Sequence, residues 1–260
     1  MASSRRFLGA TRGALRTLGA VAMFMPRWYA RRPGSPAARR IETGYFRWIV
    51  RGAGVRVERR GTPAPGAGTL YVANHISWVD IPLLASLIDA DFVSKTDVAR
   101  WPLVGPLARR FGTLFVTRER RGGTAAQAEA IARRLQGGQG IILFPEGTTA
   151  GGLRLLPFRT SLFAAAASAA RVQPVAISYA APDGGPMAPD HLADVAWERK
   201  ESVVANAVAI ARRRTRAVVT FLPPLDPAAY ADRKALALAA YHAIAGAGDA
   251  APRRRSDVQP

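Results

Sequence analysis

The chain has 260 residues, of which none is cysteine and three are histidine, so disulfides and thiolate metal sites are excluded and a multi-histidine metal site is not expected. With 49% hydrophobic residues, it can bury the core of one large domain with a short extension. Its formal net charge of +19 indicates a polyanionic partner: nucleic acid, anionic lipid, or a phosphorylated or acidic substrate.

The first predicted helix covers residues 3–25 and is amphipathic. Its apolar face and its basic face are formed by Phe7, Leu8, Thr11, Leu15, Leu18, Ala22 and Met25, and by Arg5, Arg6, Arg12 and Arg16. No charge-free run reaches the roughly 18 residues that a membrane-spanning helix needs. We therefore expect a helix that lies in the membrane interface, with Trp28 and Tyr29 at the level of the lipid headgroups.

A linker rich in Pro, Gly, Ser and Arg covers residues 31–40, and a second amphipathic helix is predicted at about 38–52. Its apolar and basic stripes are Ile41, Tyr45, Trp48 and Ile49, and Arg40, Arg47 and Arg51. The apolar stripe suits either a membrane surface or packing on the following domain. Residues up to about Gly34 are expected to be removable without loss of the catalytic fold.

From Val55 the pattern alternates between strand and helix, which predicts an α/β domain with a central, mostly parallel or mixed sheet flanked by helices. The predicted strands are 55–59, 69–73, 91–94, 113–116, 140–144, 174–179 and 217–222. The predicted helices are 80–88, 102–111, 124–135, 158–170, 202–213 and 227–245. The expected division is N-terminal membrane-associating helices at 1–54, a catalytic domain at 55–246, and a basic disordered tail at 247–260.

The stretch from Asn74 to Asp80 connects the predicted strand 69–73 to a helix that begins at Asp80. His75 therefore lies in a strand-to-helix turn, at the edge of the sheet where ligands of α/β proteins bind. A polar turn residue and a helix cap are the plain alternative. However, the Asp80 carboxylate can also hold the imidazole in one tautomer and leave the other ring nitrogen as a base. Such a pair suits the deprotonation of a hydroxyl that belongs to a substrate.

Two further stretches present polar groups at strand ends. The strand at 113–116 leads to Arg118, whose planar guanidinium can bind a phosphate or carboxylate through two hydrogen bonds. The apolar strand at 140–144 is followed by Glu146 and Gly147, and the glycine lets the backbone approach a ligand closely. A solvated arginine and an ordinary loop are the plain alternatives for these two stretches.

In order and spacing, these stretches resemble the lysophospholipid/glycerolipid acyltransferase family, in its branch of bacterial 1-acyl-sn-glycerol-3-phosphate acyltransferases. The first block of that family, N-H-x-x-x-x-D, corresponds to Asn74, His75 and Asp80. The second block, G-x-x-F-[IV]-x-R, is present at residues 112–118, and the third, F-P-E-G-T, is matched without change at 144–148. A fourth block, a strand centred on Val-Pro, is matched weakly at 172–175. The resemblance covers about residues 55–224.

The resemblance implies transfer of a fatty acyl group from acyl-carrier protein or acyl-CoA to the free hydroxyl of a lysolipid, giving phosphatidic acid in phospholipid biosynthesis. His75 is then the general base and Asp80 orients it. The implied contacts to the acceptor or its phosphate are Asn74, Lys95, Arg118, Glu146, Gly147, Thr148 and Arg159. No metal ion or bound cofactor is implied, and the enzyme would work on the cytoplasmic face of the inner membrane, peripherally or shallowly inserted.

Two departures from the family pattern place the acceptor in question. Thr149 and Ala150 stand where relatives often carry Arg and Ser, and residues 158–161 read Phe-Arg-Thr-Ser rather than Phe-Lys followed by small residues. Both stretches are similar to the lyso-ornithine-lipid branch of the family. The expected acceptor is 1-acyl-sn-glycerol 3-phosphate, and lyso-ornithine lipid is the alternative.

A rival of another class is a non-enzymatic basic protein that binds membrane or nucleic acid. Its charge would fit, but no helix-turn-helix, ribonucleoprotein or zinc pattern is present. Acidic groups at strand ends, such as Asp80 and Glu146, would repel phosphates. Nucleic acid is therefore not an expected partner, whereas an anionic membrane surface is.

Overall fold

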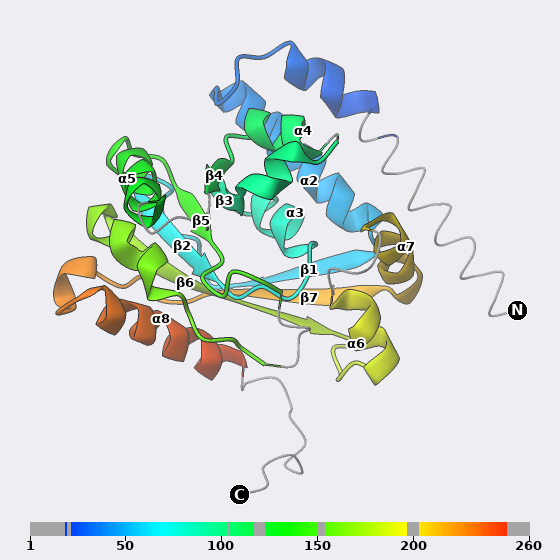
Figure 1. Ribbon diagram of the computed structural model, residues 1–260. Helices are drawn as coiled ribbons and strands as arrows, with labels where there is room; N and C mark the ends of the chain where they lie inside the picture. The colour runs from blue at the N-terminus through cyan, green and yellow to red at the C-terminus, as the bar shows by residue number, and fades with distance from the viewer. Residues whose placement is uncertain are drawn as a thin grey trace, which may run out of the picture.

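The computed structural model describes residues 19, 22–102, 104–116, 123–149, 154–196 and 203–248. Its centre is a seven-stranded sheet in the order β1-β7-β6-β2-β5-β3-β4 (Figure 1). Neighbouring strands are parallel except β6 and β7, so β1 and β7 run opposite to the other five. The strands are β1 (Val55–Arg60), β2 (Thr69–Ala73), β3 (Asp91–Lys95), β4 (Leu114–Val116), β5 (Ile141–Leu143), β6 (Arg171–Ala180) and β7 (Thr215–Phe221).

Helices cover both faces of this sheet (Figure 1). They are α2 (Pro36–Gly52), α3 (Asp80–Ala85), α4 (Val104–Arg110), α5 (Gly123–Gln136), α6 (Pro189–Val195), α7 (Val203–Arg213) and α8 (Arg233–Gly248), with the 3-10 helices η1 (Thr96–Arg100), η2 (Thr160–Ser168) and η3 (Pro227–Ala229). A further helical segment at 22–29 precedes α2. Of the helices in the described ranges, none is both long and apolar enough to cross a membrane.

The alternation of side chains along each strand divides the core into two layers. On β2, Tyr71 and Ala73 join one layer, whereas Leu70 and Val72 join the other. The first layer contains residues of α2, α3, α6 and α7, and the second contains residues of α5, η2 and α8. Burial on both faces explains why the central strands are almost continuously hydrophobic rather than alternating with polar residues.

The N-terminal helices are continuous with this core. Val50 of α2 is buried in the first layer, and Arg39 of α2 bonds the buried carboxylate of Asp91 on β3 at 2.5 Å. Trp28 is 1% exposed, stacks on Phe111 with ring centroids 4.4 Å apart, and donates its indole N–H to Glu42. The expected N-terminal unit at 1–54 is thus packed into the catalytic domain from residue 28 onward. Most of the first predicted helix, at 3–25, lies outside the described residues.

Arg110 of α4 also contacts the end of the helical segment 22–29 and holds it against the domain. Its guanidinium lies over the rings of Trp28 and Tyr29, at 4.8 and 4.6 Å from their centroids. It also donates to the backbone carbonyls of Trp28, Tyr29 and Arg31 at 2.9–3.2 Å. Cation–π contact and satisfaction of free carbonyls at a helix end both stabilise this arrangement.

All seven predicted strands and the α/β architecture are confirmed, whereas the helices differ from the prediction in several places. The 3-10 helix η1 was not predicted, and the helix predicted at 227–245 is divided into η3 and α8. The helix predicted at 80–88 ends at Ala85, because the Ser86 hydroxyl donates to the Leu83 carbonyl and competes with helix propagation. The segment predicted as a helix at 158–170 contains the 3-10 helix η2, whose spacing of three places the buried Phe163 and Ala166 in one row. Helix α6 was not predicted, because its seven residues directly follow a Pro- and Gly-rich loop.

Candidate active site

Five parallel strands, β2 to β6, end at one edge of the sheet, and the first and third family blocks directly follow the ends of β2 and β5. His75 lies in the turn after β2, Lys95 is the last residue of β3, and Phe144 to Thr148 follow β5. Parallel pairing therefore brings together residues that are far apart in the sequence, as expected for the ligand-binding edge of an α/β sheet.

His75 and Asp80 form the predicted pair, with Nδ1 of the imidazole 2.9 Å from Oδ2 of the carboxylate. Asp80 begins α3 and is fully buried. Its Oδ2 also accepts the backbone N–H groups of Ile76 and Ser77, at 2.6 and 2.8 Å, so the carboxylate also holds the turn that carries His75. A carboxylate on Nδ1 places the ring proton there and leaves Nε2 as the basic nitrogen.

Glu146 holds the same turn from the end of β5. Its Oε1 accepts the backbone N–H of His75 at 2.7 Å, and its Oε2 accepts the backbone N–H of Leu156 at 2.8 Å. This contact confirms that His75 and Glu146 meet in one site. Burial raises the pKa of the Glu146 carboxyl, which is 4% exposed, and the two N–H donors oppose that rise.

Two further contacts fix the orientation of the turn. The His75 ring stacks on Phe144, with centroids 4.2 Å apart and planes 18° from parallel. The Asn74 side chain pairs with the backbone of Ile177, donating to its carbonyl at 2.9 Å and accepting its N–H at 2.7 Å. Asn74 thus ties the end of β2 to β6, so its observed contacts are structural.

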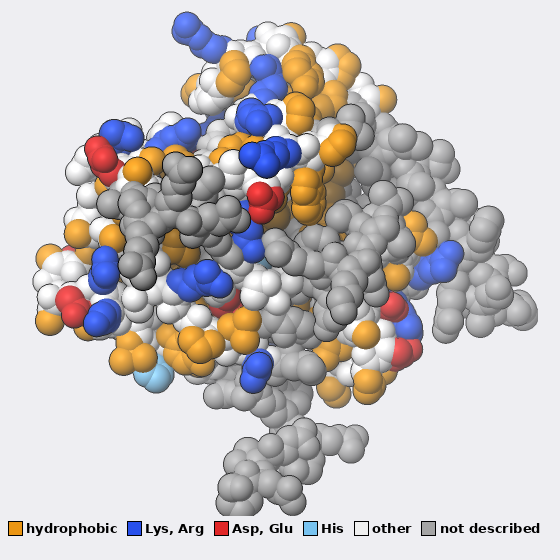
Figure 2. Space-filling view, in the orientation of Figure 1, with side chains coloured by type: hydrophobic (Ala, Val, Ile, Leu, Met, Phe, Trp, Pro, Cys, Tyr) orange, Lys and Arg blue, Asp and Glu red, His pale blue; other side chains and the backbone are white. Residues whose placement is uncertain are grey.

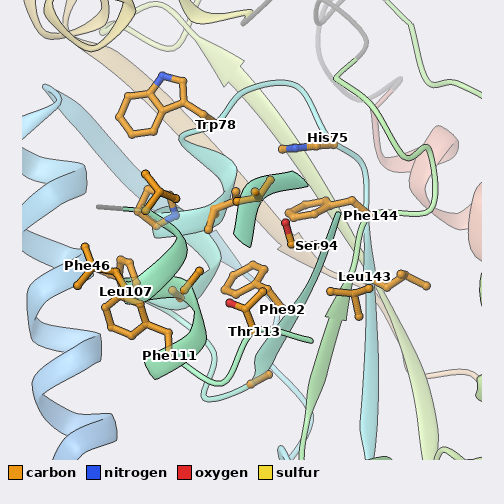
Figure 3. Close-up of a pocket in the computed structure, with 18 of the residues that line it drawn as sticks. Phe46, His75, Trp78, Phe92, Ser94, Leu107, Phe111, Thr113, Leu143 and Phe144 are labelled. Atoms are coloured by element: carbon orange, nitrogen blue, oxygen red, sulfur yellow. The ribbon is translucent and has the colours of Figure 1, made fainter. Parts of the chain in front are cut away.

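A mostly apolar cavity of about 510 Å³ opens beside His75. Figure 3 shows His75 and Phe144 at one end of it and Phe46, Leu107 and Phe111 at the other. Tyr45, Phe46 and Ile49 of α2 line the cavity, so this part of the helix packs on the catalytic domain, whereas Trp48 of the predicted apolar stripe is 37% exposed. The volume is within the range of small-molecule pockets.

The predicted contacts to the acceptor fall into three groups. Lys95, Gly147 and Thr148 line the cavity, and Gly147 has the positive φ of 72° that favours glycine. Asn74, Glu146 and the exposed Arg159 are not among the lining residues. Arg118 lies outside the described residues, so its acceptor contact stays a prediction. For Glu146, the geometry favours a structural role over contact with the acceptor.

Tyr179 is a residue of the site that the sequence analysis did not identify. It lies near the end of β6, and its hydroxyl donates to Asp80 Oδ1 at 2.6 Å. Burial, together with the neighbouring Asp80, raises the pKa of Tyr179 well above its ordinary value. The available signal was the period of two along β6, which places Tyr179 on the same face as Ile177. Within the described part of the chain, no three His, Cys, Asp or Glu side chains form a group that could hold a metal ion.

This chain is similar to several known proteins. A model of the Acyltransferase family matches residues 37–178. A lyso-ornithine lipid O-acyltransferase from Rhodobacter capsulatus is 38% identical over 221 residues, which cover 82% of this chain and 76% of the relative. One from Rhizobium meliloti is 42% identical over 70% of this chain, and the match spans 65% of the relative.

Two other matches come from proteins named for a different acceptor. A 1-acyl-sn-glycerol-3-phosphate acyltransferase from Neisseria meningitidis is 38% identical over 52% of this chain and 54% of its own length. A crystal structure of the 1-acyl-sn-glycerophosphate (LPA) acyltransferase PlsC from Thermotoga maritima has the same fold as this chain, with a TM-score of 0.68 at 20% identity. The superposed region covers 98% of this chain and 100% of the PlsC chain. The family model matches more than half of this chain, and the Rhodobacter relative aligns with most of it, so this chain belongs to the Acyltransferase family.

Proposed function

We propose that this protein transfers a fatty acyl group from acyl-CoA or acyl-carrier protein to the free hydroxyl of a lysolipid. The observation that carries the proposal is the His75–Asp80 pair at one end of an apolar cavity. No serine or cysteine nucleophile is needed, because the attacking oxygen belongs to the acceptor. The proposed reaction also calls for no metal ion or bound cofactor.

In the proposed reaction, Nε2 of His75 takes the proton of the lysolipid hydroxyl as the oxygen attacks the thioester carbonyl. Asp80 stabilises the imidazolium that forms. The tetrahedral intermediate then collapses, the carbon–sulfur bond breaks, and the thiolate of the donor takes the proton back from His75. One ester bond is formed and one thioester bond is broken, so the step needs no further reactant.

The polar groups beside the pair are suited to the negative charges of the reaction. Gly147 and Thr148 bring backbone close to the cavity. The Gly147 N–H is donated to the Phe144 carbonyl at 3.1 Å, so we assign the Thr148 N–H to the oxyanion or the acceptor headgroup. Lys95 at the end of β3 lines the same cavity and supplies a positive charge. We assign the headgroup of the acceptor to this side and the acyl chains to the apolar side formed by α2, η1 and α4.

Lyso-ornithine lipid is the acceptor that we propose first. Relatives with that name match up to 82% of this chain, whereas the Neisseria relatives named for 1-acyl-sn-glycerol 3-phosphate match 52%. Thr149 and Arg159, which differ from the family pattern, also favour lyso-ornithine lipid as the acceptor. 1-Acyl-sn-glycerol 3-phosphate is the second candidate, because the N-H-x-x-x-x-D and F-P-E-G-T blocks are complete.

We further propose that the protein works at an anionic membrane surface, on the cytoplasmic face of the inner membrane. Ile81, Trp101 and Val104 are 40–45% exposed and also line the cavity, so they lie at its mouth. Figure 2 shows hydrophobic and basic side chains intermixed over the region of α2 and α4. An exposed apolar rim with basic neighbours suits peripheral contact with anionic lipid.

The test is an assay of the purified protein with each lysolipid in turn, and with acyl-CoA or acyl-carrier protein as the donor. We expect product with lyso-ornithine lipid, and turnover lower by about 10²- to 10⁴-fold from a His75→Ala variant of equal thermal stability. Turnover of 1-acyl-sn-glycerol 3-phosphate alone would reverse the order of the acceptors. Equal turnover by wild type and His75→Ala would refute the mechanism.

A further inference from the structure

The two oxygens of the buried Asp80 carboxylate have different sets of partners. Oδ2 accepts from Nδ1 of His75 and from the backbone N–H groups of Ile76 and Ser77. Oδ1 accepts from the hydroxyl of Tyr179 at 2.6 Å. A buried carboxylate is costly to ionise unless donors compensate it. Only the ionised form can orient the imidazole and stabilise it once it is protonated.

Tyr179 reaches Asp80 from a separate part of the fold. It stands 99 positions along the chain, on β6, and the turn that carries the pair follows β2. The reciprocal hydrogen bonds between the Asn74 side chain and the Ile177 backbone hold these two strand ends in register. Tyr179 is not among the residues that line the cavity, so it does not reach a substrate there.

Because its pKa is raised, Tyr179 keeps its proton over the working pH range and remains a donor. The titratable groups that face Asp80 in the described residues are His75 from its own turn, Tyr179 from β6 and Glu146 from the end of β5. The hydroxyl is therefore a neutral donor that disperses carboxylate charge without adding a competing positive charge.

We propose that Tyr179 is a positioning residue for acyl transfer, acting through Asp80 on the basicity and orientation of His75. Its hydroxyl occupies Oδ1, which leaves Oδ2 for the imidazole and the turn. This inference rests on the proposed function and deepens it. Removing the hydroxyl would concentrate negative charge toward the imidazole and favour its protonated form, so less free base would be present at a given pH.

The first test is Tyr179→Phe, which removes one oxygen atom and keeps the aromatic ring. We expect kcat, measured at a pH on the acid limb, to fall by about 10- to 100-fold, the range for loss of one hydrogen bond to a charged group. The KM values for both substrates should stay unchanged, and the acid limb of the kcat/KM profile should move to higher pH. Wild-type kcat with an unmoved acid limb would overturn the proposal. The wild-type rate, measured in the same assay, tests the proposed function independently.

Tyr71→Phe is the matched control. Tyr71 is 1% exposed on the adjacent strand β2, and its hydroxyl donates to the Ala64 carbonyl at 2.6 Å. The same atom is removed from a neighbouring strand, at a hydroxyl that bonds a backbone carbonyl rather than Asp80. Wild-type kcat and pH profile are expected. If both variants lost kcat alike, the Tyr179 effect would be general damage to the sheet and the proposal would fail.

A double variant separates coupling from packing. If Tyr179 acts through Asp80, adding Tyr179→Phe to Asp80→Asn should lower kcat no further, whereas independent sites would show multiplied losses. If Tyr179→Phe alone does not fold, Asp80→Asn should restore folding by removing the uncompensated charge. Failure to restore folding, or multiplied losses, would show that the hydroxyl does not act through Asp80.

Discussion

The two sides of the catalytic cavity are built by different forces. On the side that holds His75, the side chains of Asp80, Glu146 and Asn74 fix the structure through short, directional hydrogen bonds of 2.6–2.9 Å. The two carboxylates accept these bonds, and the Asn74 amide both donates and accepts. The opposite side is lined by apolar residues of α2, η1 and α4 that touch without preferred direction. Directional bonds specify one geometry, whereas apolar contact tolerates changes of shape. From this difference we expect the polar side to determine the chemical step and the apolar side to determine which acyl chains bind.

The largest expected effect comes from replacing His75 or Asp80 on the polar side. His75→Ala should reduce turnover by about 10²- to 10⁴-fold, as loss of a general base does, and Asp80→Asn should reduce it severely. Initial rates at saturating lysolipid and acyl donor are the measurement. Near-normal turnover in His75→Ala, with melting temperature preserved, would remove the base from this site.

The next effect tests whether Glu146 belongs to the polar scaffold or to the acceptor site. Glu146→Gln retains one acceptor oxygen but presents an amide group to the other backbone N–H. We expect the free energy of unfolding to fall by about 1–3 kcal/mol, with a lower kcat and unchanged KM for the lysolipid. Chemical denaturation and steady-state kinetics measure the two parts. A selective rise in the lysolipid KM without loss of stability would instead place Glu146 against the acceptor.

On the apolar side, Leu107→Trp should alter the preference for acyl-chain length while leaving the chemical step intact. The larger ring occupies cavity volume, and each methylene that is no longer buried should lower kcat/KM by about fourfold. The readout is kcat/KM over a series of acyl donors. Leu238→Trp is the control, since Leu238 is 56% exposed on α8 and does not line the cavity. A uniform loss for all chain lengths would show that Leu107 is outside the chain-binding region.

The rim of the apolar side should contribute to membrane binding. Replacing Trp101 and Val104 together with serine should weaken sedimentation with anionic vesicles by roughly tenfold at high salt, where insertion rather than charge holds the protein. Leu238→Ser, on α8, is the matched control. Equal sedimentation of all three proteins would refute contact through this rim.

A truncation must respect the packing of Trp28. The expectation that residues up to about Gly34 can be removed does not fit a tryptophan that is 1% exposed and stacked on Phe111. Truncation at residue 21 keeps Trp28 and removes most of the predicted first helix. We expect this shorter protein to fold and to sediment less than the intact chain. Full sedimentation would show that the removed residues are not the anchor.

The smallest effect concerns His191, which lies away from both sides of the cavity. Burial lowers the pKa of its ring, with a contribution from Arg213, and its Nε2 lies 2.9 Å from the Thr215 hydroxyl. The folded protein thus favours the neutral ring, so this contribution to stability is complete above pH 6.5 and is lost as pH falls through the lowered value. His191→Gln should make the melting temperature less sensitive to pH below 6.5, and an unchanged slope would contradict this assignment.

The local part of the site was predictable because chain connectivity determines it. His75 and Asp80 are five positions apart in one strand-to-helix turn, so any folding of that turn brings them close. The strands were predictable for a related reason, since sequence runs that are buried on both faces are hydrophobic throughout. A strand at 140–144 followed by a loop was predicted, and β5 is found there, although it ends at Leu143, so that all of F-P-E-G-T lies in the loop.

The roles of individual polar residues depended on contacts between distant strands. Glu146 bonds the backbone of His75 across 71 positions, and Tyr179 bonds Asp80 across 99. Which oxygen meets which donor follows from the register of β2 with β5 and β6, and a shift of one residue would turn these side chains to the other face. Whether α2 lies on a membrane or on the domain was likewise open in its sequence, because an apolar stripe is satisfied by either surface. Only the assembled domain separated the two surfaces, because Tyr45 and Ile49 line its cavity whereas Trp48 is 37% exposed.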